Sequence, residues 1–475
     1  MENKAHNGAR CLAVANVSLC LLVSLMPSCG KARVSPAETS LEADVHQYLR
    51  LAVALGERDP DSLDYYYGSE GLVADIRKQP PTLREIRQSA DGLVEHLRLH
   101  AELQAEDRMR EEYMIRQLRA ISSRVDMLTS VPMTFDQETA AVFGVTVPAS
   151  YDRRHMAQVR AELDRLLPGK GSLAQRYESF DAAFTIPSVK LKEVMQKAIQ
   201  GCREATMAHI DLPAGEATEL KFVHNKPWSG YSFYQGSYRS VVEINTDFAL
   251  TVDRVLQLAC HETYPGHHVY NSLQEAKLVH GRKMDELAVQ PTFSPQSLVS
   301  EAAATLAIDV AFPPVDRLRF EREVLFPLAG LDGSKAARYL KVEALVDELH
   351  QAEPEIARDY LDGKLEFERA NSALEEQTLM THGEVALKYI NEYRSYIATY
   401  TYGRDLTAKL LGQPVSSGGQ SSVSWERYSK WMMSPPATMN SEAATPARED
   451  SASQRRVTIG RNESAVKQKQ LIPVI

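Results

Sequence analysis

A short histidine-rich stretch that contains a proline constrains the fold of this chain more than any other feature. From His261 to His268 the sequence reads His-Glu-Thr-Tyr-Pro-Gly-His-His, with three imidazoles and a carboxylate in eight positions. Imidazole is a preferred zinc ligand. In a straight helix His268 would share the azimuth of His261 but lie about 10.5 Å further along the axis. Pro265 cannot donate to the carbonyl of His261, so we expect the helix to break and to swing His267 towards a metal held by His261.

A catalytic zinc site needs a third protein ligand and leaves its fourth position to water. We select Glu301, which lies 40 residues beyond His261 in a predicted helix whose small side chains, Ala302 to Ala304, allow close approach. Glu275 and Glu286 are alternative candidates for the third ligand, on the basis of their sequence separation from the histidines alone.

The other residues of the stretch suggest catalytic and supporting roles. Glu262 is the candidate general base, because a carboxylate beside a zinc ligand can accept the proton of a bound water. Its alternative role is to orient His268. His268 itself is an alternate ligand in place of His267, or a residue that binds the substrate or its oxyanion. Cys260 is a candidate nucleophile, a small buried residue or a disulfide partner of Cys202.

The motif His-Glu-x-x-Pro-Gly-His-His resembles the signature of a bacterial family known as domain of unknown function 885, which is similar to the gluzincin metallopeptidases. The resemblance covers about residues 40 to 436, and only the motif is specific. It implies a zinc cofactor and points to Glu301, although Ala302-Ala303 stands where the family has Gly-Trp. It also implies that Tyr400 donates to an oxyanion, with Arg394 binding a carboxylate, whereas tyrosines spaced four apart on a helix also occur simply as packing residues.

Composition limits the class of protein. The chain has 475 residues, with 63 acidic and 54 basic side chains and a net charge of -9, so it lacks the basic surface of a nucleic-acid-binding protein. The 44% hydrophobic and 25% charged content is typical of a globular protein. Beyond the N-terminus no apolar run is long enough for a membrane helix.

The N-terminus has the pattern of an export signal. Basic residues precede an apolar run from Cys11 to Met26, which ends at Pro27-Ser28-Cys29. We predict a lipoprotein-type signal peptide over 1–28, cleaved before a lipidated Cys29, and a tether over 29–38. The protein is then anchored in the cell envelope by lipid alone, or secreted if the signal is of the plain type.

Helical periodicity dominates the rest of the chain, and we predict a mainly α protein with a zincin-like lobe that carries a short strand or small sheet. An N-terminal helical scaffold spans 39–210, with two long antiparallel helices between Thr82 and Leu128. A gluzincin-like catalytic region spans 211–412, with a strand over 238–245. In gluzincins a strand at this place binds the substrate backbone, and a strand that merely covers the metal-binding helix is the alternative. A C-terminal extension with one helix covers 413–439, and a disordered tail covers 440–475.

Together these features predict a cell-envelope zinc hydrolase that cleaves amide bonds of peptides or peptide-like substrates. The alternative is a metallopeptidase-like binding lipoprotein that holds the metal or a ligand without turnover.

Overall fold

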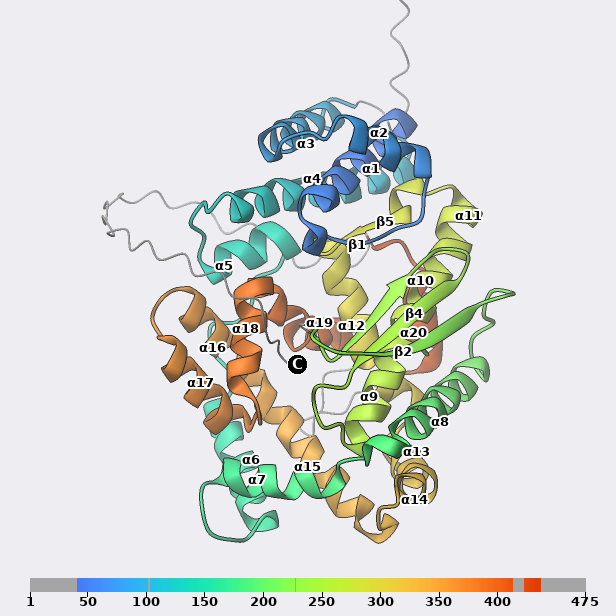
Figure 1. Ribbon diagram of the computed structural model, residues 1–475. Helices are drawn as coiled ribbons and strands as arrows, with labels where there is room; N and C mark the ends of the chain where they lie inside the picture. Colours follow the sequence, from blue (N-terminus) through green and yellow to red (C-terminus); the bar gives the residue numbers. More distant parts are fainter. Residues whose placement is uncertain (1–40, 101–102, 227, 413–422, 437–475) are drawn as a thin grey trace, which may run out of the picture. The chain divides into compact units, whose positions relative to one another are not determined.

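Four helices open the described part of the chain (Figure 1). The computed structural model describes residues 41–100, 103–226, 228–412 and 423–436. Its first helices are α1 (Leu41–Arg58), α2 (Glu70–Lys78), α3 (Leu83–Leu97) and α4 (Ala105–Leu128). The helix pair predicted between residues 82 and 128 is confirmed as α3 and α4. Thr82 and Glu85 form a capping box that starts α3. Apolar side chains of α1, α3 and α4 share one core, which includes Tyr48, Leu93 and Leu118.

The next four helices lie between residues 135 and 207. They are α5 (Phe135–Glu138), α6 (Arg153–Leu166), α7 (Leu173–Asp181) and α8 (Ser188–Met207). They belong to the predicted N-terminal helical scaffold, and α7 continues into a 3-10 turn that ends at Phe184. Asp152 caps α6 by accepting from two backbone N–H groups, and Ser172 caps α7.

A three-stranded sheet follows α8. Its strands are β2 (Ala217–Val223), β3 (Gly230–Tyr234) and β4 (Arg239–Asn245), in the order β2-β4-β3, with β4 parallel to β2 and antiparallel to β3. The strand predicted over 238–245 is thus present, but its expected pairing with a substrate is wrong. Because β4 is central, its backbone groups already bond to both neighbours, whereas β3 is an edge strand.

A second, two-stranded sheet was not predicted. β1 (Leu63–Tyr66) pairs antiparallel with β5 (Val289–Pro291), more than 220 residues away in the sequence. Tyr65, Tyr67 and Tyr234 pack their rings together, with centroids 5.5 to 5.6 Å apart. The tyrosine cluster of residues 65–67 therefore joins the two sheets by packing.

The remaining helices form the part of the chain that carries the histidine-rich stretch. They include α9 (Val252–Glu262), α10 (His267–Gln274), α11 (His280–Arg282), α12 (Pro295–Ala311), α13 (Pro314–Phe320) and α14 (Phe326–Ala329). After them come α15 (Ala336–Leu349), α16 (Glu353–Leu361), α17 (Phe367–Ala373), α18 (Gly383–Tyr393), α19 (Tyr402–Leu410) and α20 (Trp425–Met432). The one helix predicted in the C-terminal extension is confirmed as α20.

Helix α12 is the central element of this part (Figure 1). It contacts α9, α10 and α19, and 15 of its 17 residues are buried. The small side chains of Ala302, Ala303 and Ala307 allow these neighbours to approach closely, as the sequence predicted. The described residues between Leu41 and Pro436 form one compact unit, and the predicted class, mainly α with small sheets, is confirmed.

Among the described residues, no single helix is both long and apolar enough to cross a membrane. One bent pair, α12 with the segment Pro314–Ala329 at 75° to it, meets both criteria together. The predicted signal peptide, the lipidated Cys29, the tether and the C-terminal tail lie outside the described residues.

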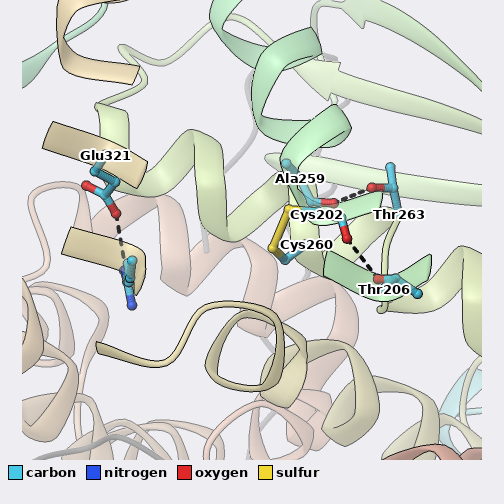
Figure 2. Close-up of a disulfide and its surroundings, with 7 residues drawn as sticks. Cys202, Thr206, Ala259, Cys260, Thr263 and Glu321 are labelled. Carbon is cyan, nitrogen blue, oxygen red and sulfur yellow. Dashed lines mark hydrogen bonds and ion pairs between the residues drawn. A yellow bond between two sulfur atoms is a disulfide. The ribbon is translucent and has the colours of Figure 1, made fainter. Parts of the chain in front are cut away.

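A disulfide joins Cys202 of α8 to Cys260 of α9 (Figure 2). Both cysteines are fully buried, and their Cα atoms lie 5.6 Å apart. The chain between them contains the whole three-stranded sheet. Of the roles proposed for Cys260, the structure selects the disulfide, which fixes α9 one residue before His261.

Candidate metal centre

The helix that carries His261 ends at the predicted break. α9 stops at Glu262, the Tyr264–Pro265 peptide bond is cis, and α10 starts at His267. Gly266 passes close to the end of α9, where a Cβ atom would lie 1.9 Å from the carbonyl oxygen of His261. Only glycine fits this approach. The Pro-Gly pair therefore redirects the chain so that α10 begins beside the last turn of α9.

This break brings His261, His267 and Glu301 together. Nε2 of His261 lies 3.2 Å from Nε2 of His267 and 3.3 Å from Oε2 of Glu301, and the distance from His267 Nε2 to that oxygen is 3.5 Å. Ligands bound tetrahedrally to zinc at about 2.05 Å stand about 3.3 to 3.4 Å apart. The three atoms thus have the spacing of one face of a zinc tetrahedron.

Neighbouring side chains hold two of these residues in place. Nδ1 of His267 lies 3.1 Å from the hydroxyl of Ser300, and a hydrogen bond donated by Nδ1–H leaves the Nε2 lone pair for a metal. Tyr396 donates from its hydroxyl to Oε1 of Glu301 at 2.7 Å. The other carboxylate oxygen, Oε2, is buried and accepts no hydrogen bond from the described residues. An orphaned oxygen aimed at two imidazole nitrogens fits a bound cation.

Electrostatics keep Glu301 ionised. Burial alone would raise the pKa of Glu301, but the imidazoles of His267 and His261 hold it far below its usual range. Burial would likewise lower the pKa of His267, but Glu301 and Glu262 raise it to about 9. Without a metal, protons on the histidines balance the negative charge of the carboxylates in this group. A bound dication can supply that positive charge instead.

Glu262 lies at the end of α9, buried beside the cluster. Burial raises the pKa of its carboxyl, and the neighbouring histidines oppose that effect. Gly230 of the edge strand β3 packs against it, since a Cβ there would lie 2.8 Å from Oε1 of Glu262. A larger residue at 230 would push this carboxylate out of position.

His268 points away from the cluster and is not a member of it. Its Nδ1 lies 2.9 Å from Ser240 Oγ, and its Nε2 lies 3.0 Å from Oε2 of Glu216. Tyr264 also donates to that oxygen, at 2.6 Å. The ring is fully buried, which lowers the pKa of His268. The alternate role of His268 as ligand or substrate group, and that of Glu262 as its orienting partner, are therefore wrong, because Glu216 and Ser240 take up both ring nitrogens.

Glu216 is a residue that the sequence reasoning missed. It anchors His268 and Tyr264 and forms an ion pair with Arg203 of α8. It precedes β2 in a Pro- and Gly-rich segment that offers no periodic signal.

The rival carboxylates lie elsewhere. Glu275 accepts from Tyr234 and from the backbone N–H of Ser237, and Glu286 forms a buried ion pair with Arg110. Both carboxylates have partners of their own and neither belongs to the cluster.

Of Tyr400 and Arg394, the two further candidates for the active site, only Tyr400 lies near the cluster. Tyr400 lies near the cluster, with its ring centroid 6.4 Å from that of His261 and its hydroxyl 3.0 Å from that of Tyr389. Arg394 instead forms an ion pair with the buried Glu138 of α5. The guanidinium proposed to bind a substrate carboxylate is thus occupied within the protein.

Two cavities, each of about 480 Å³, reach the cluster. Both are lined by His261, Glu262, Tyr400, Tyr389 and Gly230. The first extends along α9, α12 and α15 and is rich in carboxylates and arginines, and the second follows β3 and the tyrosines of α18 and the turn after it. The two cavities therefore meet at these residues.

Comparison with known proteins gives little further information. No family model matches the chain, and no curated protein matches it. One solved structure, described as a putative lipoprotein of unknown function from Shewanella oneidensis, is similar with a TM-score of 0.38 and 9% identity over 78% of this chain and 75% of that chain. A TM-score this low does not establish a shared fold.

Proposed function

We propose that this protein is a zinc-dependent hydrolase that cleaves amide bonds in peptides or peptide-like molecules, with a relation to the gluzincin-like family that its motif resembles. The observation that carries the proposal is the 3.2 to 3.5 Å spacing of His261 Nε2, His267 Nε2 and Glu301 Oε2. Three protein ligands at the wall of open cavities are typical of catalytic sites, because structural zinc sites use four.

Zinc bound by these residues would polarise a carbonyl group and lower the pKa of a water molecule. Glu262 is the proton acceptor, since its carboxylate is buried next to His261 and lines both cavities. It later returns the proton to the leaving amine. The hydroxyl of Tyr400 is the donor to the oxyanion, a role supported by its place beside His261 in both cavities.

The edge strand β3 supports a peptide as the substrate. It runs along the second cavity, and one of its edges is not used by β4. An extended peptide can add to such an edge through its regular main-chain donors and acceptors. Aromatic side chains from Tyr231, Phe233, Tyr393 and Tyr396 line the same cavity and offer apolar contacts to its side chains.

Export is part of this proposal. The Cys202–Cys260 disulfide suits an oxidising compartment, in agreement with the predicted signal and lipid anchor at Cys29. The substrate is then a peptide or a peptide-like fragment of the cell envelope.

The test combines metal analysis with a peptide-library cleavage screen. The mature protein should contain zinc, and Glu262→Gln should keep the ion while lowering cleavage by about 10²- to 10⁴-fold, the usual contribution of a general base. Glu162→Gln is the matched control, because that half-buried carboxylate lines neither cavity and pairs only with Arg165 and Lys341 among the described residues.

Two outcomes would reject the hydrolase. Full cleavage activity in metal-free protein would exclude a zinc mechanism. Zinc bound at His261 and His267 without cleavage of any library peptide would favour the alternative, a binding protein.

A further inference from the structure

A second group of metal-ligand residues lies among the N-terminal helices, apart from the site described above. Asp44 is in the first turn of α1, His96 in the last turn of α3, and His100 follows α3. One potential ligand atom from each residue lies within 4.8 Å of the others. None of these residues lines either cavity of the candidate active site.

Helical spacing places the two histidines on one face. After α3 the chain continues as a tight turn, in which Leu99 and His100 donate from their backbone N–H groups to the carbonyl groups of His96 and Leu97. Residues four apart therefore project to the same side, and the two imidazole centroids lie 5.2 Å apart. Asp44 faces both rings.

The contact distances fit a shared cation. Oδ1 of Asp44 lies 3.5 Å from Nε2 of His96, and Oδ2 lies 3.4 Å from Nε2 of His100. These separations exceed good hydrogen bonds, but they match the distance of about 3.3 to 3.4 Å between tetrahedral zinc ligands.

Buried atoms without partners point to a missing ligand. Oδ2 of Asp44 and both ring nitrogens of His100 are buried and form no hydrogen bond with the described residues. The side chains of Asp44 and His100 are only 6% and 10% exposed. Buried polar atoms normally have partners, so Oδ2 of Asp44 and Nε2 of His100, which face each other without a hydrogen bond, indicate that a ligand satisfies them.

Glu111 of α4 completes the arrangement. Its Oε2 lies 3.3 Å from Nδ1 of His100, on the opposite side of the ring from Asp44. Histidines that bind metals usually direct their second ring nitrogen at a carboxylate, which fixes the tautomer. Among the described residues, Asp44 and Glu111 form ion pairs only with these histidines. Two carboxylates facing two imidazoles match the charge of a dication.

We propose that Asp44, His96 and His100 bind a divalent transition-metal ion, zinc or one of similar preference, and that Glu111 orients His100. Nitrogen and oxygen ligands of this kind favour zinc over calcium or magnesium. The ion links the start of α1 to the end of α3, and through Glu111 to α4. The helices that it links carry no residue of the candidate active site, so this ion binds apart from the proposed hydrolytic reaction.

The test counts zinc ions in mature protein equilibrated with buffered free zinc. The wild type should bind two ions, the double variant His96→Ala/His100→Ala one, the double variant His261→Ala/His267→Ala one, and the quadruple variant none. Because the two pairs are removed separately, failure of the active-site proposal and failure of this one give different results. One ion in the wild type that is lost only with His261 and His267 overturns the second site.

Two conservative variants test the site even if the alanine variants fail to fold. Asp44→Asn keeps the shape of the side chain and should abolish the zinc-dependent rise in the thermal midpoint measured in the His261→Ala/His267→Ala background. Glu111→Gln should weaken zinc binding at this site by about 10- to 100-fold, the usual effect of a group that orients a ligand. A zinc-dependent rise that Asp44→Asn leaves unchanged would show that the three residues form an ion-pair network without a metal.

Discussion

Reduction of the Cys202–Cys260 disulfide should destabilise the protein and loosen the metal centre. The bond closes a loop with a sequence separation of 58 residues. In the chain-entropy model, a loop of this length restricts the unfolded chain by about 4 kcal/mol at 25 °C. Residual structure in the unfolded chain reduces that value, so we expect reduction to lower the free energy of unfolding by about 2 to 4 kcal/mol.

The assay compares oxidised and reduced wild-type protein in equilibrium urea unfolding, both free of metal so that the reductant has no ion to chelate. This comparison leaves every core atom in place, whereas alanine substitution at two fully buried positions would add cavities. The variant Cys202→Ala/Cys260→Ala serves as the control, since reductant should not change its stability.

The same bond should affect the metal, because Cys260 precedes His261 and holds α9 against α8. Reduced protein should bind zinc more weakly at the candidate active site. Equal stability of the two forms to within about 1 kcal/mol would refute the reasoning, since the loop would then place no restriction on the unfolded chain.

Three further predictions concern single residues. Gly266→Ala should lower the free energy of unfolding by more than about 3 kcal/mol, because the new Cβ would meet the carbonyl of His261; unchanged urea unfolding would contradict this. Tyr396→Phe removes the hydrogen bond to Glu301 and should weaken zinc binding by about 10- to 100-fold in competition with a chelator, with no loss of thermal stability in the metal-free state beyond about 1.5 kcal/mol. Burial raises the pKa of Asp347 to about 6, above its usual value of 3.8, so the folded state holds this proton more tightly and stability falls as pH rises from about 4 to 6. Asp347→Asn should make the free energy of unfolding fall by about 2 kcal/mol less over this pH range. This value is smaller than the full pKa shift implies, because the side chain is partly exposed to solvent. Parallel plots of stability against pH for the variant and the wild type would contradict the prediction.

Much of the helical architecture could be predicted from the sequence because it is encoded locally. The helices α6, α7 and α8 lie between Pro and Gly residues and carry apolar stripes with helical spacing. The break between α9 and α10 was predictable for the same reason, since Pro265 and Gly266 act on the backbone of their own turn.

Long-range pairing could not be predicted. β1 and β5 are short and lie more than 220 residues apart, so neither carries the alternation that identifies a strand. The order β2-β4-β3 depends on a parallel pairing between strands that are separated by β3 in the sequence. For this reason the expectation that residues 238–245 pair with a substrate backbone was wrong, because β2 and β3 occupy both edges of β4.

In the candidate site, too, local sequence patterns were predictable and long-range contacts were not. His261, Glu262 and His267 form a motif, and Glu301 was found by its helix and by family resemblance. The residues that hold them, Ser300 and Tyr396, are ordinary in sequence and acquire a role only through packing. The second site has a local signal in the spacing of His96 and His100, but Asp44 lies 52 residues before His96 and joins them only in the folded chain.

Anomalous scattering at the zinc absorption edge, recorded from crystals of the mature protein grown with zinc, tests the central claim most directly. A peak should lie about 2.0 to 2.2 Å from His261 Nε2, His267 Nε2 and Glu301 Oε2. The absence of anomalous density between these three atoms in zinc-equilibrated crystals would contradict the metal centre and the hydrolase proposed from it.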